Sequence, residues 1–532
     1  MQGLKSAQIK ALERLSTRSM HAQAVISPEI ARTLTELSFD IRRQIGLIID
    51  RRGRITAVVV GDARRLVLPD IHRRGMNRLS GVRLIHTHLT NEALSNDDLT
   101  DLVTLRLDLI AALIVQTDGM PGSLYSAHLL PDNAAQDPWN LLPPSSIHAL
   151  EEDFLDFIEA LEEEFSRTQY QLSTDDPRER AILIHVSTLP PSIAHDSLDE
   201  LKELARSAGI KTVQEVLQRR PIDSRLVLGK GKMQSVLISA MQKGAELLVF
   251  DTNLSPSQLR SLGDFTDLKI LDRTQLILDI FAQHAVTREG KLQVELAQLR
   301  YLLPLLNIRQ KALSRLTGGI GGRGPGETRL EIDRRRARDR IARLEREVAQ
   351  LGERRRLRRQ VRTEKNVPTV AVVGYTNAGK STLLNHLTNS DVTAKDFLFA
   401  TLNPVSRRLR FPQEREIIIT DTVGFIRELP EDLMAAFRTT FEELDEADLL
   451  LHVVDAHSPD LSDKMKTVLD TVRSLELDHK PIVTVFNKID LCSPEEIEGL
   501  LHQYEGVPVC ALDRGSFAPL LTLLEERLWP AD

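Results

Sequence analysis

The stretch VAVVGYTNAGKSTLLNHL, residues 370–387, constrains the fold more than any other part of the chain. A run of β-branched residues leads into a glycine-bounded loop, then Lys380 and Ser381, and then a helical pattern. The pattern G-x-x-x-x-G-K-[ST] lets backbone N–H groups close around phosphate oxygens at a helix N-terminus. In it the lysine neutralises the β and γ phosphates, and the serine hydroxyl ligates Mg²⁺. The stretch therefore predicts a phosphate-binding loop between a buried strand and a helix.

Two later motifs identify the nucleotide. In IIITDTVGF, Asp421 ends an apolar strand and Gly424 follows three residues later, as a metal carboxylate and a γ-phosphate N–H would require. In IVTVFNKID, Asn487, Lys488 and Asp490 end another strand. An aspartate there can accept hydrogen bonds from guanine N1 and its exocyclic amine, which adenine does not offer. A solvated tetrapeptide is the alternative, but three motifs in this order, each after a strand, favour a GTP site.

Length and composition set the outer limits. A chain of 532 residues is too long for one hydrophobic core, so we expect several domains. Apolar runs such as DLLLHVVD are far shorter than a membrane helix needs, and we expect neither a membrane span nor a secretion signal. Only Cys492 and Cys510 are present, which fits a reducing, cytoplasmic environment. Peripheral association with a membrane stays an open alternative.

The sequence outside the nucleotide motifs predicts further α/β units. Short apolar runs alternate with helical stretches over residues 180–280, which indicates a parallel sheet. Residues 25–130 form another α/β pattern, and the turn-rich, acidic stretch from Asp118 to Asp176 is a candidate boundary. The glycines and proline of LTGGIGGRGPGE exclude a helix or strand there. We expect the domains 1–175, an accessory α/β domain with a linker; 176–306, an α/β subdomain; 307–365, the glycine-rich loop and arginine-rich helices; and 366–532, the nucleotide-binding domain.

The arginine-rich segment, residues 329–362, has two interpretations. Ile341, Leu344, Val348 and Leu351 recur at helical spacing, so the segment predicts one or two basic amphipathic helices. Interleaved acidic residues could pair with the arginines along a solvated face. Arginine forks also bind phosphates bidentately and stack on bases, which favours contact with RNA.

Taken together, GYTNAGKST, FATLNP, DTVGFI and NKID resemble the HflX family of TRAFAC-class GTPases. LDRTQLILDIFAQHAVTREGKLQVELAQLRYLLPLL and GGIGGRGPGETRLEIDRRR resemble the N-terminal hallmark of that family, and the likeness spans about two-thirds of the chain. It implies an α/β fold in which a P-loop GTPase domain, a mostly parallel sheet with helices on both faces, follows a smaller α/β subdomain and basic helices. Here an additional N-terminal α/β domain precedes them. The resemblance implies a GTPase that binds the large (50S) ribosomal subunit and promotes ribosome splitting, recycling or rescue.

The resemblance also assigns nucleotide-site residues. Thr401 is the implied switch threonine for Mg²⁺ and the γ-phosphate, and Ser381 is the second Mg²⁺ ligand. Lys380, Thr401 and Gly424 are the implied catalytic groups. The GTP or GDP contacts are Gly374, Tyr375, Thr376, Asn377, Ala378, Gly379, Lys380, Ser381, Thr382, Phe399, Ala400, Thr401, Leu402, Asn403, Asp421, Thr422, Val423, Gly424, Asn487, Lys488, Ile489, Asp490, Cys510, Ala511 and Leu512.

Two positions depart from the common GTPase pattern. Cys510 stands where serine is usual in the guanine-supporting loop, and a buried structural cysteine is the alternative interpretation. Phe425 stands where many small GTPases place a water-orienting glutamine, so we expect slow intrinsic turnover. Relatives with an apolar residue there often carry a P-loop asparagine that holds K⁺, and Asn377 has that position. Asn377 could instead only allow a left-handed loop conformation.

The N-terminal region contains LIHTHLTNEALSNDDLTDL, which resembles the H-x-H…S-x-x-D pattern of JAB/MPN-type zinc peptidases. His86 and His88 at i and i+2 of a strand point to one face, with Asp98 as a third candidate ligand. The spacing is one residue short, Leu89 replaces a proline, and arginine occupies the upstream acidic position. Ordinary strand histidines in an accessory domain are therefore the leading interpretation, ahead of a bound metal and of peptidase activity.

Two functions from different classes follow. The first is a GTP-hydrolysing ribosome factor, monomeric, whose glycine-rich loop and arginine-rich helices contact ribosomal RNA. The second is a regulatory GTP-binding scaffold that acts on a protein partner through its N-terminal domain. A third, a peptidase regulated by GTP, requires stoichiometric zinc. Stimulation of GTP hydrolysis by large ribosomal subunits distinguishes the first from the others.

Overall fold

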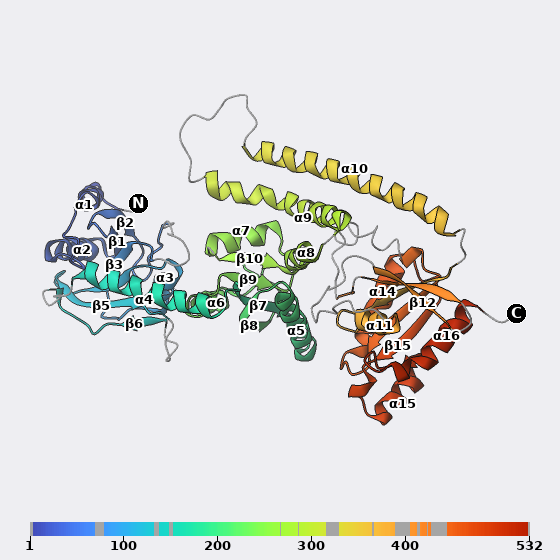
Figure 1. Cartoon of the computed structure of the whole chain (residues 1–532). Helices are drawn as coiled ribbons and strands as arrows, with labels where there is room; N and C mark the ends of the chain where they lie inside the picture. The colour runs from blue at the N-terminus through green and yellow to red at the C-terminus, as the bar shows by residue number, and fades with distance from the viewer. Residues whose placement is uncertain are drawn as a thin grey trace. The chain divides into compact units, whose positions relative to one another are not determined.

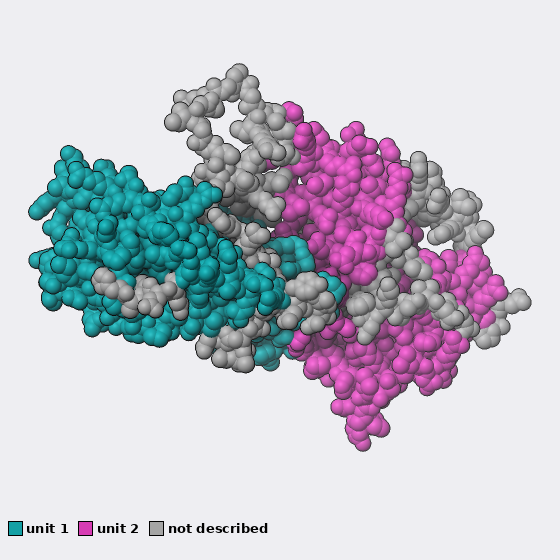
Figure 2. Space-filling model, turned by 60° about the vertical axis from the view of Figure 1, so that its left-hand side comes forward, with its two compact units in different colours: residues 1–198, 210–271 teal, residues 199–209, 272–532 magenta. Residues whose placement is uncertain are grey.

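The structure is a computed structural model of the chain, and it describes residues 4–69, 79–131, 138–147, 153–266, 268–285, 287–314, 329–363, 367–388, 405–411, 415–422, 424–426 and 444–529. These residues divide into two compact units (Figure 2). Unit 1 comprises residues 1–198 and 210–271, and unit 2 comprises residues 199–209 and 272–532. Within the described ranges, no helix is long and apolar enough to cross a membrane.

Unit 1 begins with a mixed six-stranded sheet in the order β2-β1-β3-β4-β5-β6 (Figure 1). Strands β3 and β4 are parallel, and the other described neighbour pairs in this sheet are antiparallel. The strands are β1 (Ile45–Asp50), β2 (Ile55–Val60), β3 (Val82–His88), β4 (Leu109–Val115), β5 (Pro121–Leu129) and β6 (Trp139–Leu141). The accompanying helices are α1 (Ser6–Ser16), α2 (Pro28–Ile41), α3 (Asn96–Thr104) and α4 (Phe154–Asp175).

The core of this domain extends beyond residues 25–130, the range of the α/β pattern in the sequence, and stays within the expected domain 1–175 apart from packing by α6 (Lys230–Gln242). Strand β4, LIAALIV, is buried at every position, as expected for a central strand covered on both faces. The turn-rich stretch that we considered a boundary contributes β5 and β6 to the same sheet. Helix α4 adds Phe154, Ile158 and Leu161 to the same core. Short strands separated by turns carry a weak sequence signal, and their pairing partners decide their conformation.

The second sheet of unit 1 has the order β10-β9-β7-β8. Strand β7 pairs in parallel with both β8 and β9, which confirms the parallel α/β unit expected from the alternating pattern. Its elements are β7 (Arg180–Ser187), β8 (Lys211–Arg219), β9 (Leu247–Phe250), β10 (Lys269–Asp272), α6 (Lys230–Gln242) and α7 (Pro256–Phe265). Helix α5 (Pro191–Ser207) begins in unit 1, and its residues from 199 onward belong to unit 2. Ile238 and Met241 of α6 also pack against the core of the six-stranded sheet.

Unit 2 contains a helical segment and the predicted nucleotide-binding domain. Helices α8 (Arg273–His284), α9 (Arg288–Ser314) and α10 (Arg329–Thr363) form the helical segment, and α9 and α10 lie side by side (Figure 1). The arginine-rich sequence is thus one helix, with Leu344 buried on its apolar face. The glycine-rich loop lies outside the described residues.

Arginine–glutamate pairs join α9 and α10 in both directions. Arg340 donates two hydrogen bonds of 2.8 Å to the carboxylate of Glu295. Arg300 of α9 donates to Glu345 of α10 at 2.6 Å. These pairs support the interpretation that some of the arginines form ion pairs within the protein, because a charged hydrogen bond satisfies both side chains.

The nucleotide-binding domain is a six-stranded sheet in the order β12-β13-β11-β14-β15-β16. All neighbouring strands are parallel except β12 and β13, so the predicted mostly parallel sheet is confirmed. The strands are β11 (Thr369–Gly374), β12 (Val405–Arg410), β13 (Glu416–Asp421), β14 (Leu449–Asp455), β15 (Ile482–Asn487) and β16 (Val507–Pro508). The helices are α11 (Lys380–Leu387), α14 (Leu461–Ser474), α15 (Pro494–Gln503) and α16 (Ala518–Leu528), with short 3₁₀ turns at Ile489–Leu491 and Arg514–Phe517.

Candidate functional site

The predicted phosphate-binding loop connects the carboxyl end of β11 to the first turn of α11. Gly374 has φ +155°, and a Cβ atom there would lie 2.2 Å from the Val453 carbonyl oxygen. Gly379, the residue before α11, has φ +87°, and its added Cβ would lie 2.2 Å from Asn487 Nδ2. Both positions therefore require glycine, because any side chain would strain the backbone and collide with the neighbouring segment. The loop can only close tightly over the sheet with this sequence.

Lys380 points back into its own loop. Its Nζ donates to the carbonyl oxygens of Gly374 at 3.1 Å and Tyr375 at 2.8 Å. Burial lowers the pKa of Lys380 to about 8, and the negative charge of Asp421 opposes that shift. His452 on the neighbouring strand β14 has its pKa lowered to about 4, first by burial and second by the charge of Lys380. The lysine is thus a buried cation held at the place where phosphates are expected.

Ser381 and Asp421 come together from different elements. Ser381 Oγ, in the first turn of α11, donates to Asp421 Oδ2, at the end of β13, over 2.7 Å. A hydroxyl and a carboxylate are the hard oxygen donors that Mg²⁺ prefers, so this pair fits the predicted metal site. Thr422 follows, and its Oγ1 donates to the Val372 carbonyl at 2.5 Å, which anchors this end of the strand to β11.

Gly424 and Phe425 close the other side of the loop. A Cβ atom at Gly424 would lie 2.9 Å from Lys380 Nζ, so the backbone here approaches the lysine closely. The Phe425 side chain is fully buried, and its backbone exchanges hydrogen bonds with Gly374 and Thr376. An apolar side chain packed into the core cannot orient an attacking water. The burial of Phe425 therefore agrees with the slow intrinsic turnover expected from the sequence.

Asn487 joins the phosphate end of the site to the predicted base end. It is 1% exposed, its Nδ2 donates to the Ala378 carbonyl at 2.8 Å, and its Oδ1 accepts from the Ala511 N–H at 2.9 Å. Lys488 adopts a left-handed conformation with φ +64°, and its Nζ lies 2.7 Å from Asp455 Oδ2. The motif that suggested guanine recognition is therefore also a structural brace.

Asp490 and Cys510 face each other at the predicted base position. Asp490 is exposed, in the short turn after β15. Burial raises the pKa of the Cys510 thiol, and a hydrogen bond with Asp490 raises it further. Cys510 is 8% exposed, whereas Leu512 is 71% exposed. Cys510 is thus a buried residue of the predicted loop, as in the alternative interpretation of a structural cysteine. Asp490 is exposed and accessible to a ligand.

Other predicted site residues have plain placements or fall outside the described ranges. Asn377 is exposed and has φ +61°, the left-handed conformation that its alternative interpretation required. Outside the described residues lie Phe399, Ala400, Thr401, Leu402, Asn403 and Val423.

Sequence reasoning missed two contributors to this site. His452 lies beside Lys380 in the middle of an apolar strand, and Asp455 holds Lys488. Asp455 had a usable signal, since it ends an apolar strand of a parallel sheet as Asp421 and Asn487 do. The place of His452 depends on which strands are neighbours, as does the contact of Asn487 with the carbonyl of Ala378, itself a predicted site residue.

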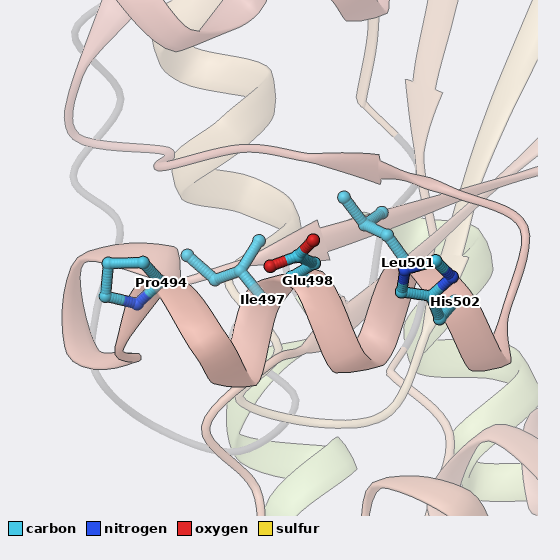
Figure 3. Close-up of a pocket in the computed structure, with 5 residues that line it drawn as sticks. All are labelled: Pro494, Ile497, Glu498, Leu501 and His502. Carbon is cyan, nitrogen blue, oxygen red and sulfur yellow. The ribbon is translucent and has the colours of Figure 1, made fainter.

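A shallow pocket elsewhere in the domain is lined by one face of α15 (Figure 3). Its lining residues are Pro494, Ile497, Glu498, Leu501 and His502. None of them belongs to the nucleotide motifs, so this pocket is not the predicted GTP site.

Three family models match the chain in consecutive order. "GTP-binding GTPase N-terminal" matches residues 195–282, and "GTP-binding GTPase Middle Region" matches residues 284–362. "50S ribosome-binding GTPase" matches residues 369–488, which contain the phosphate-binding loop and the Asn487 motif.

Two relatives are similar in sequence over more than half of this chain. "GTPase HflX" of Caldanaerobacter subterraneus subsp. tengcongensis is 49% identical over 315 residues, covering 59% of this chain and 73% of the relative. "GTPase HflX" of Escherichia coli is 44% identical over 317 residues, covering 59% and 74%. The crystal structure of a GTP-binding protein from Sulfolobus solfataricus with GDP is 24% identical, with TM-score 0.36, covering 66% of this chain and 97% of that one. On the sequence matches, the chain belongs to the HflX family of GTPases, and it binds guanine nucleotide and hydrolyses GTP.

Proposed function

We propose that the chain couples GTP binding to association with the large (50S) ribosomal subunit, and that it promotes ribosome splitting, recycling or rescue. The support that carries this proposal is the match of residues 369–488 to the family described as "50S ribosome-binding GTPase". The arginine-rich helix α10 supports it independently. Arg335, Arg336 and Arg338 are exposed on that helix, and arginine forks suit ribosomal RNA phosphates. We place this activity in the cytoplasm, with the protein acting as a monomer.

The nucleotide would be held by the backbone of the phosphate-binding loop and by a few side chains of the other motifs. Backbone N–H groups from Gly374 to Gly379 would surround the phosphates at the start of α11, and Lys380 would neutralise them. Asp490 would accept hydrogen bonds from guanine, with Ala511 held beneath it by Asn487. Gly424 would present its N–H to the γ-phosphate, next to the lysine.

Mg²⁺ would be held by Ser381 and Thr401, with Asp421 on the side of Ser381. Bound Mg²⁺ would supply charge compensation for the phosphates during hydrolysis. The Ser381–Asp421 contact supports this assignment, because both donors already converge. Ser381→Ala should raise the Mg²⁺ concentration needed for half-maximal hydrolysis, while Lys380→Ala should weaken GTP binding at any Mg²⁺ concentration.

Asn377 would hold K⁺ near the phosphates and offset charge where other GTPases use an arginine finger. Its exposed position in the loop supports this role. Exchanging Na⁺ for K⁺ at equal ionic strength should raise turnover, and Asn377→Ser should remove that difference with GTP binding almost unchanged. Equal rates in both salts would refute the K⁺ site and leave Asn377 as a loop residue.

The glycine-rich loop and α10 would contact ribosomal RNA. The loop residues Gly318–Gly326 carry little side-chain bulk, and Arg323 among them could pair with a phosphate. Deleting the loop, or changing Arg334, Arg335 and Arg336 to glutamate, should spare GTP binding because these residues lie outside the nucleotide motifs. Both changes should weaken ribosome binding. The arginine variant should also show a flatter salt dependence, since fewer counterions are released.

Co-sedimentation with ribosomal subunits in a non-hydrolysable GTP analogue tests the proposal. We expect the chain to pellet with the large subunit in the analogue and to stay in the supernatant with GDP. Light scattering should then show ribosome splitting that the loop deletion slows. A chain that never pellets with ribosomes would favour the alternative, a GTP-controlled scaffold that acts on a protein partner through residues 1–175.

A further inference from the structure

A second cluster of chemically active side chains lies in unit 1, separate from every nucleotide motif. His86 and His88 come from the end of β3, and Asp98 comes from the first turn of α3. The two histidines are 1% and 5% exposed. Their possible ligand atoms, together with a carboxylate oxygen of Asp98, all lie within 4.8 Å of one another. Two imidazoles and a carboxylate are thus gathered in a buried position.

The spacing within the cluster matches the ligand shell of a tetrahedral metal. Nε2 of His86 lies 3.0 Å from Nε2 of His88 and 3.2 Å from Oδ1 of Asp98. Nε2 of His88 lies 3.6 Å from Oδ2 of Asp98. Ligands at the usual Zn–N and Zn–O lengths in a tetrahedron are about 3.3 Å apart. A zinc ion would therefore need shifts of only a few tenths of an ångström.

Surrounding groups hold two of these side chains in a ligating orientation. Nδ1 of His88 lies 2.9 Å from the Glu92 carbonyl oxygen. A carbonyl oxygen only accepts hydrogen bonds, so Nδ1 carries the ring proton of neutral His88 and donates it to this oxygen. In neutral His88 the lone pair of Nε2 then points into the cluster. Ser95 donates both its N–H and its hydroxyl to Oδ2 of Asp98 at 2.7 Å, which leaves Oδ1 directed at His86. Such outer hydrogen bonds orient metal ligands in proteins.

The atoms that converge in the cluster favour a cation at this place. The His88 lone pair and the Asp98 carboxylate are both acceptors, whereas the neighbouring Asp97 lies 3.9 Å from Arg65 and is already paired. Within the described residues, Nδ1 of buried His86 has no hydrogen-bond partner, so no group outside the cluster fixes its proton. The acceptor atoms of His86, His88 and Asp98 repel one another unless a shared proton or a metal ion lies between them. Imidazole nitrogens suit zinc rather than Mg²⁺ or Ca²⁺, which prefer oxygen.

We propose that His86, His88 and Asp98 bind one zinc ion through His86 Nε2, His88 Nε2 and Asp98 Oδ1. The ion fastens the first turn of α3 to the end of β3. Because α3 packs on α6, the fastening stabilises the contact between the two sheets of unit 1. Three protein ligands leave a fourth position for water. No acidic side chain from the segment before β1 supports that water, since Arg42 and Arg43 stand there, so the role assigned is binding and not peptide hydrolysis.

Metal analysis of the full chain tests this site directly. After purification without chelator and dialysis against metal-free buffer, we expect about one zinc per chain. Cobalt substituted for zinc should give the visible absorption of a tetrahedral site. Removing zinc should lower the melting temperature of unit 1, and adding it back should restore that temperature, because an ion that binds only the folded state stabilises it. GTP hydrolysis should not change.

Variants distinguish this site from incidental binding. Asp98→Asn and His88→Ala should lose the zinc and the cobalt absorption. His128→Gln is the matched control, a buried histidine of β5 in the same sheet that should keep both. The wild-type cobalt spectrum remains informative if a variant fails to fold. A zinc-free wild-type chain with no cobalt absorption and a protonated His88 in its NMR spectrum would overturn the proposal, as would equal zinc in wild type and both cluster variants.

Discussion

The nucleotide site of unit 2 and the histidine cluster of unit 1 are built at the same kind of place by different means. Both lie where a strand of a parallel pair ends and a helix begins, β11 and α11 in one case, β3 and α3 in the other. The nucleotide site assembles glycine-rich backbone from segments far apart in the sequence. The cluster uses three side chains within 13 positions, from His86 to Asp98. The difference follows from ligand size, since a nucleotide must be enclosed and an ion only coordinated.

The comparison implies that the two sites can be damaged separately. Lys380→Ala removes the buried ammonium that would face the phosphates, and we expect GTP affinity to fall about 100-fold. Zinc content should stay the same. A fluorescent GTP titration and metal analysis of the same preparation measure both quantities. Lys466→Ala, an exposed lysine on α14, is the control and should bind GTP normally. Loss of zinc from the Lys380 variant would show that the two sites are coupled.

The nucleotide site should depend on its internal brace more than on any one surface residue. Asn487→Ala leaves the Ala378 carbonyl and the Ala511 N–H without their buried partner, which should lower the free energy of unfolding by about 3 kcal/mol. Urea unfolding of unit 2, followed by intrinsic fluorescence, measures this loss. Asn487→Asp keeps the acceptor for Ala511 and loses the donor to Ala378, so an intermediate loss is expected. A stability equal to wild type in both variants would mean that the brace is not needed.

The base end of the nucleotide site has a smaller and more specific effect. Asp490→Asn should weaken GTP binding about tenfold, because an amide replaces the carboxylate that would accept two hydrogen bonds from guanine. The amide can donate to the additional carbonyl of xanthine, so xanthosine triphosphate should bind better than it does to wild type. Parallel titrations with the two nucleotides measure the exchange. Unchanged GTP affinity would remove Asp490 from base recognition.

The smallest expected effect is a pH dependence of GTP affinity. Burial lowers the pKa of Lys380 to about 8 in the free protein, and bound phosphates would keep the lysine protonated. Full affinity is therefore present below pH 8 and declines as pH rises toward the pKa of the complex, by at most about tenfold per pH unit. GTP titrations between pH 7 and 9.5 measure the slope. Lys380→Arg should flatten it, because arginine stays charged throughout this range.

Short sequence motifs predicted much of the nucleotide site. The loop, its glycines, Lys380 and the pairing of Ser381 with Asp421 all follow from local spacing and from parallel strands that end at one edge. The family and the parallel sheet were also predicted and are confirmed. For the histidine cluster, the i and i+2 spacing on a strand placed His86 and His88 on one face and named Asp98 as the third candidate, and the structure brings all three together.

Contacts that depend on strand order could not be predicted in this way. Asn487 reaches Ala378 across 109 positions, and this contact requires β14 to lie between β11 and β15. The strands β5 and β6 were hidden in a turn-rich stretch, because their conformation is stabilised by pairing within the N-terminal sheet and not by local propensity. The sequence of α10 likewise gave no sign that Arg340 and Glu345 pair with Glu295 and Arg300 of α9.

The rate of GTP hydrolysis with and without purified large ribosomal subunits tests the central proposal most directly. Phe425 is buried and no glutamine follows Gly424, so the chain alone should turn over slowly and depend on a partner to complete the site. We predict that large subunits raise the rate by about tenfold or more, that small subunits do not, and that Lys380→Ala abolishes the response. Equal rates with and without large subunits would contradict the assignment of this GTPase to the ribosome.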